Sequence, residues 1–107
     1  MSNEVVSTLR KAADLLESKG WTQGAFARNG HEEVSINDPQ ANCFCVLGAI
    51  IFSNCIGDLR TRAALARYLN LDRDEWVLDW NDDPTRTKEE VIKTLRDCAD
   101  SLETVNA

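Results

Sequence analysis

Residues 4–17 (EVVSTLRKAADLLE) and residues 90–103 (EVIKTLRDCADSLE) are two nearly identical stretches, matching at nine of fourteen positions. Apolar residues recur in each at offsets 0, 1, 4, 7, 8 and 11, the period of an amphipathic helix. The apolar positions are Val5, Val6, Leu9, Ala12, Ala13 and Leu16 in the first stretch, and Val91, Ile92, Leu95, Cys98, Ala99 and Leu102 in the second. We therefore predict helices over residues 3–19 and 87–104 that present the same face to one core.

The likeness stops where these two helices stop. The sequence GWTQGAF that follows the first stretch has no counterpart after Glu103, and a repeat array needs several complete units. We interpret the pair as two framing helices of one bundle. Thr87 and Glu90 form a capping box at the start of the second helix, and Gly20 is placed to end the first one in the αL conformation.

A polar stretch over residues 21–38 follows the first helix, rich in glycine, asparagine and aspartate. The Asn29-Gly30 pair predicts a two-residue type I′ turn, so we expect a short β-hairpin or an extended loop. Because a lone hairpin is only marginally stable, its apolar residues must pack partly on the helices; they are Trp21, Phe26, Val34 and Ile36.

The sequence CFCVLGAIIFSNCI (43–56) is apolar on every side, which predicts a central buried helix over residues 40–55. We expect it to start at Asp38-Pro39 or at Asn42 and to end at Gly57. Gly48 weakens a helix interior, and this predicts that a backbone or a large ring, such as Trp80, approaches closely there.

Two further helices are predicted over residues 58–70 and 74–80. In the first, Asp58 serves as the cap, Asn70 closes the helix, and Leu59, Ala63, Ala66 and Leu69 face inward. The predicted fold class is therefore mainly α: residues 1–107 form one small helical bundle of about four helices, with a short hairpin or loop after the first.

The net charge of −6 argues against direct nucleic-acid binding, which needs clustered lysine and arginine. The N-terminal residues lack the pattern of a secretory signal, and the longest apolar run is too short to span a membrane. We expect a cytoplasmic protein without membrane contact, whose four cysteines are thiols.

Cys45 is the strongest candidate for a catalytic residue. In the first turn of a helix begun near Asn42, its thiolate would be favoured by the amide dipoles. His31, the only histidine, is a candidate base with Asn81 or Asp82 to orient its ring. The alternative is that Cys45 is a small buried hydrophobe and that His31 lies on the surface.

Metal binding is a second possibility, because the chain offers Cys43, Cys45, Cys55, Cys98 and His31. The spacing fits zinc poorly: the Cys43-x-Cys45 gap is short and no second pair exists. Cys55 would lie about 15 Å from Cys45 along a continuous helix. We predict no metal site and no cofactor.

An acidic run spans residues 72–83. Its candidate binding residues are Asp72, Asp74, Glu75, Trp76, Asp79 and Asp83. One interpretation is a docking surface for a basic partner, anchored by Trp76, since tryptophan is enriched among interface hot spots. The alternative is a solvated face with helix caps. Asn81 and Asp82 are interpreted as satisfying backbone amides at the turn into the last helix.

The segments GWTQGAFAR, CFCVLGAI and WNDDPTRTKEEVIKTLRDCA together resemble a family of small phage, prophage and actinobacterial proteins that form a domain of unknown function. The resemblance covers most of the chain and implies no catalytic residue, substrate or cofactor. It implies a compact accessory protein of the kind that binds a host protein, including the nucleases of defence systems.

Three functions are therefore weighed. The leading one is a non-enzymatic, phage-type accessory protein that binds a host protein with a basic surface and inhibits a defence nuclease complex of the CRISPR-like kind. The alternative is a cysteine-dependent enzyme or small-ligand domain centred on Cys45, with Gln23, His31 and Asn81 nearby. The third is a self-associating protein, such as a homodimer.

Overall fold

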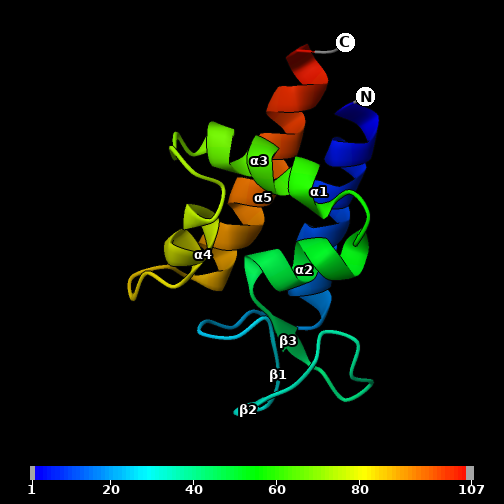
Figure 1. Ribbon diagram of the computed structural model, residues 1–107, viewed down its shortest axis with the longest axis vertical. Helices are drawn as coiled ribbons and strands as arrows, with labels where there is room; N and C mark the ends of the chain where they lie inside the picture. The colour runs from blue at the N-terminus through cyan, green and yellow to red at the C-terminus, as the bar shows by residue number, and fades with distance from the viewer. Residues whose placement is uncertain (1, 106–107) are drawn as a thin grey trace.

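The computed structural model describes residues 2–105, which form five helices and one small three-stranded sheet (Figure 1). The predicted mainly α fold is confirmed. The helices are α1 (Ser2–Ser18), α2 (Val46–Ser53), α3 (Asp58–Tyr68), α4 (Trp76–Asn81) and α5 (Lys88–Val105). The strands are β1 (Ala27–Asn29), β2 (Glu32–Glu33) and β3 (Cys43–Phe44).

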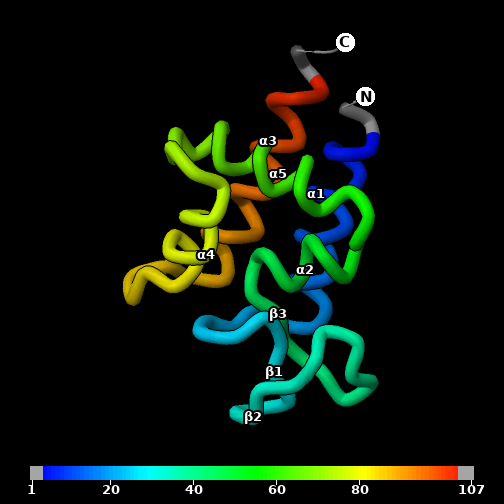
Figure 2. Tube along the Cα trace, viewed as in Figure 1, coloured from blue at the N-terminus to red at the C-terminus, as the bar shows by residue number. Residues whose placement is uncertain are grey.

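The two similar stretches become α1 and α5, which run antiparallel and make the most extensive helix–helix contact (Figure 2). Their repeated apolar positions line the core as predicted, with Leu102 only partly buried. Arg10 pairs with Asp100 and Glu103 at 2.7 and 2.9 Å, and Arg96 pairs with Asp14 and Glu17 at 2.9 and 2.8 Å.

These ion pairs explain why the two stretches are alike. Arg10 and Arg96 occupy equivalent positions in the two stretches, 86 residues apart. The carboxylates that they bind are equivalent in the same way, Asp14 with Asp100 and Glu17 with Glu103. The two helices therefore meet through one self-complementary surface about a local two-fold axis, as identical subunits do in a symmetric dimer. The likeness is a packing solution used twice, as we interpreted it.

The central helix is shorter than predicted, and its start was placed wrongly. Residues 43–44 form strand β3, Cys45 is the N-cap, and α2 begins at Val46 and ends before Asn54. The reason is tertiary: Phe44 pairs with Ala27 of β1, and the Cys45 N–H donates to the Phe26 carbonyl at 3.1 Å. The helix is also not buried all round, because the Phe52 side chain is 51% exposed.

The hairpin exists, but its turn lies one residue later than predicted. The sheet order is β2-β1-β3 and both pairs are antiparallel. Asn29 pairs with Glu32, so the two turn residues are Gly30 and His31. Gly30 has a positive φ of +63°, and His31 does not have a positive φ. A type I′ turn needs positive φ at both turn residues and a type II′ turn only at the first, so this turn is of type II′. Phe26, predicted to pack on the helices, is instead exposed.

Helix α3 ends as predicted. Asn70 has a φ of +61°. Its N–H donates to the Arg67 carbonyl and the Leu71 N–H donates to the Ala66 carbonyl, which together form a Schellman motif. Ala66 is buried and Leu69 packs against the core as expected, but the rest of the inward face differs. Leu59, expected inside, is exposed, whereas Thr61 and Leu65 are buried. The N-cap is Gly57 rather than Asp58.

The last helix begins as its sequence predicts. The Glu90 N–H donates to the Thr87 hydroxyl at 3.1 Å, which is one half of the capping box. The Glu90 carboxylate instead pairs with Arg86 at 2.7 Å. Arg86 in turn lies over the Trp80 ring at 4.2 Å.

Candidate functional site

Asn81 is a fully buried polar side chain at the end of α4, and it joins three segments of the chain. Its Oδ1 accepts the Trp21 indole N–H at 2.7 Å and the Val46 N–H, the first amide of α2, at 2.9 Å. Its Nδ2 donates to the Thr22 carbonyl at 3.2 Å and to the Asp82 carboxylate at 3.0 Å. All four hydrogen-bonding sites of the amide are therefore used inside the protein.

The neighbours of Asn81 complete this network. The Gln23 Nε2 donates to the carbonyls of Asn81 and Asp83 at 2.9 and 2.7 Å, and the Gly24 N–H donates to Asp82 at 3.0 Å. The motif residues of 20–24 and 80–83 thus bind one another. Asn81 and Asp82 do satisfy backbone amides, but those of α2 and of Gly24 rather than those leading into α5.

Gly48 is the closest approach between α2 and the hairpin. A Cβ there would lie 2.1 Å from the carbonyl oxygen of Phe26. The prediction that a backbone approaches Gly48 is therefore confirmed: the three atoms nearest to such a Cβ all belong to the Phe26 backbone. Trp80 is partly buried and packs against the core.

Cys45 is fully buried, and its sulfur accepts the Gly48 N–H at 3.3 Å. Burial raises the pKa of its thiol to about 11, because an apolar surrounding disfavours the thiolate more than the nearby amides favour it. His31 is exposed in the hairpin turn, which follows the Asn29 end of β1. Phe44, the neighbour of Cys45, pairs with Ala27 at the other end of that strand. The structure therefore brings Cys45 near Asn81 but not near His31.

Native protein at low concentration, treated with iodoacetamide near pH 8, is expected to be modified quickly at the exposed Cys55 and not at Cys45. Mass spectrometry of the labelled peptides measures this. Cys45 should react only after denaturation, and fast labelling of Cys45 in the folded protein would contradict the buried environment.

The same burial predicts a stability loss at high pH. The Cys45 pKa is raised from 9.0 in the unfolded chain to about 11 in the fold. Its contribution is therefore complete below pH 9.0 and is lost as pH rises toward 11. Urea denaturation across this window should show a shallower decline for Cys45→Ala, which lacks the titrating group.

The cysteines are free and dispersed. Cys98 is buried in α5, Cys43 is half-buried in β3, and Cys55 lies exposed after α2. Across residues 2–105, no group of three histidine, cysteine, aspartate or glutamate side chains is arranged to hold a metal ion.

The residues of the acidic run divide into two sets. Asp82 belongs to the Asn81 network, and Asp83 accepts the N–H and the hydroxyl of Thr85 at 2.9 and 2.7 Å. These bonds to Thr85 lower the pKa of Asp83. The remaining members form what we call the acidic α4 surface: Asp72, Asp74, Glu75, Trp76 and Asp79.

Trp76 begins α4 and leaves 42% of its surface exposed. Asp72, Glu75 and Asp79 are exposed around it in the chain. Asp74 is half-buried and lies 4.0 Å from Arg62, while Glu75 pairs with Arg73 at 3.3 Å. In the chain, Trp76 is thus flanked by carboxylates, two of which, Asp74 and Glu75, have an arginine within 4.0 Å.

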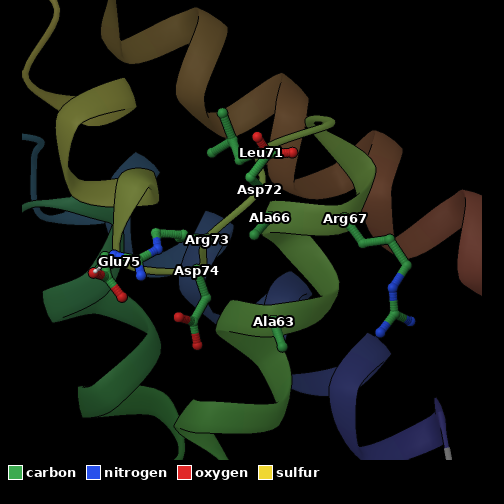
Figure 3. Close-up of a pocket in the computed structure, with 8 residues that line it drawn as sticks. All are labelled: Ala63, Ala66, Arg67, Leu71, Asp72, Arg73, Asp74 and Glu75. Atoms are coloured by element: carbon green, nitrogen blue, oxygen red, sulfur yellow. Dashed lines mark hydrogen bonds and ion pairs between the residues drawn. The ribbon is translucent and has the colours of Figure 1, made fainter.

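A hollow of about 510 Å³ opens beside this surface, where the chain passes from α3 to α4 (Figure 3). Ala63 and Ala66 of α3, with Leu71, supply its apolar lining. Asp74 and Glu75 lie with Arg73 on one side, and Arg67 extends from α3 on the other. The acidic run was visible in the sequence, but the hollow was not, because Ala63, Ala66 and Arg67 of α3 supply part of its lining.

Comparison with known proteins adds the following. A protein-family model matches residues 1–101, and its description is a family of unknown function (DUF6197). No curated protein and no solved structure matches the chain. Among the described helices, none has the length and apolar character needed to cross a bilayer.

Proposed function

Because this chain belongs to the DUF6197 family, whose function is unknown, we propose from its surface that it is a non-enzymatic binding module. In this proposal the acidic α4 surface binds a basic surface on another protein. The observation that carries the proposal is Trp76, a large ring 42% exposed at the start of α4 and flanked in sequence by exposed carboxylates.

The position of Trp76 on α4 suits it to anchor a partner protein. The next residue, Val77, is fully buried, and the end of α4 is held by the Asn81 network. The ring is therefore presented on a fixed element, which lowers the entropy lost on binding. Tryptophan side chains that fill partner pockets are common hot spots.

Charge defines the kind of partner. The exposed carboxylates of Asp72, Glu75 and Asp79 favour lysine and arginine and repel phosphate backbones. Binding should therefore weaken as ionic strength rises, since salt screens exposed charges.

The family resemblance suggests a more specific version of this function. In it, a phage-type accessory protein acts in the host cytoplasm and inhibits a defence nuclease complex by occupying its basic nucleic-acid groove. The free thiols of Cys43, Cys45, Cys55 and Cys98 support a reducing compartment.

The test is affinity capture from lysate of the natural host with three baits: wild type, Trp76→Ala with Asp79→Ala, and Phe26→Ala with Glu32→Ala. The second pair removes an exposed ring and carboxylate from the hairpin instead. We expect a stoichiometric basic partner with wild type and the hairpin variant, and its loss with the α4 variant.

Trp76 and Phe26 are 42% and 45% exposed, so each double variant removes a ring that is about half-buried, and the two variants should lose similar amounts of stability. Circular dichroism checks that both remain folded. A partner that binds all three baits equally, or no partner at all, would contradict the acidic α4 surface as the binding site.

A further inference from the structure

A second exposed surface lies where α2 turns into α3, at the right of Figure 1, whereas α4 lies at the left. Its apolar members are Phe52, Ile56 and Leu59, which are 51%, 88% and 62% exposed. Cys55 is exposed between them in the chain. We call these four residues the α2–α3 apolar surface.

A hollow of about 390 Å³ adjoins this surface, between α1 and the end of α2. Leu15 and Phe52 give it apolar walls, and Lys11, Asp14 and Ser18 line its α1 side. The Phe52 ring packs against the buried Phe44, with ring centres 5.5 Å apart. Phe52 thus belongs both to the hollow and to the apolar surface.

From this arrangement we propose that the chain forms a two-fold homodimer through the α2–α3 apolar surface, with Ile56 of each copy seated in the hollow of the other. A two-fold interface must be complementary to itself. Ser53 lines the hollow and Ile56 follows it by three residues in the turn after α2, so the exposed apolar side chain and the recess lie close together in one copy.

The charges around this face suit a second copy of the same chain. Lys11 and Asp14 put both signs beside the hollow, and Arg60 is paired with Glu4 at 3.1 Å next to Leu59. Because this face carries both positive and negative side chains, two copies can meet here without bringing like charges together across the whole interface. The acidic α4 surface, in contrast, would repel a copy of itself.

The exposed apolar area can be compared with the area that a stable dimer buries. The exposed fractions of Phe52, Ile56 and Leu59 amount to about two whole side chains, or on the order of 400 Å² per copy. A stable interface buries about 800 Å² per partner. The three apolar residues supply half of that, as a central core, and the α1 side of the hollow supplies a polar rim.

Sedimentation velocity over a range of concentrations tests the proposal with wild type, Ile56→Glu and Trp76→Ala. We expect wild type and Trp76→Ala to sediment with twice the mass of one chain at high concentration, and Ile56→Glu to remain monomeric. Ile56 is the most exposed large apolar side chain described, so the variant should fold, and circular dichroism checks that it does.

The Cys55 thiol gives an independent measurement in the unmodified chain. Its alkylation should slow at concentrations where the dimer forms, and Ile56→Glu should abolish this protection. A wild-type monomer at all concentrations would overturn the proposal, as would a dimer that Ile56→Glu leaves intact. Because Trp76→Ala is expected to dimerise, failure here is distinguishable from failure of the acidic α4 surface.

Discussion

Replacing Asn81 with alanine is expected to lower the free energy of unfolding by about 3–5 kcal/mol, a large part of the 5–15 kcal/mol typical of a domain. The change leaves two donors without an acceptor, the part-buried Trp21 indole and the buried first amide of α2. Each such group costs about 1–3 kcal/mol. The Thr22 carbonyl loses its hydrogen bond from the Asn81 amide as well.

Guanidinium or urea denaturation measures this loss, and Asn37→Ala is the matched control. Asn37 is exposed, and its recorded hydrogen bond uses the backbone N–H, which the substitution keeps. The control should change stability by less than about 0.5 kcal/mol. An equally small effect of Asn81→Ala would contradict a central structural role for the amide.

Gly48→Ala is expected to destabilise the protein by about 2–3 kcal/mol, although the same change in an open helix stabilises by up to about 1 kcal/mol. The new Cβ would lie 2.1 Å from the Phe26 carbonyl oxygen and 3.0 Å from its carbon. Both atoms are backbone, so the helix and hairpin must separate. That movement also weakens the bond from the Cys45 N–H to the Phe26 carbonyl.

Thermal and urea unfolding of Gly48→Ala, beside Ser53→Ala in the same helix, distinguish this clash from helix propensity. Ser53 is only half-buried at the C-terminal end of α2, where a small side chain has room. A stabilised Gly48→Ala would show that the hairpin adapts and that the contact with Phe26 does not constrain the fold.

The candidate site was only partly predictable from the sequence. Composition and spacing located the acidic run and marked Trp76, and these assignments required no knowledge of the fold. Which carboxylates face solvent depended on residues far away in the chain: Asp82 is engaged by Gly24, 58 positions earlier. The exposed Leu59 was expected inside, so the α2–α3 apolar surface was not foreseen.

The sequence by itself determined the two framing helices, their shared face, the capping of α5 by Thr87 and the closing of α3 at Asn70. Each depends on interactions between residues three to five apart, which the chain encodes locally. Only the tertiary structure decided where α2 begins. Residues 43–44 pair with β1 as strand β3. The Asn81 side chain, 35 positions away, accepts the first amide N–H of α2. Pairing between distant segments outweighs the local helical preference of an apolar run, because the buried backbone groups must find partners.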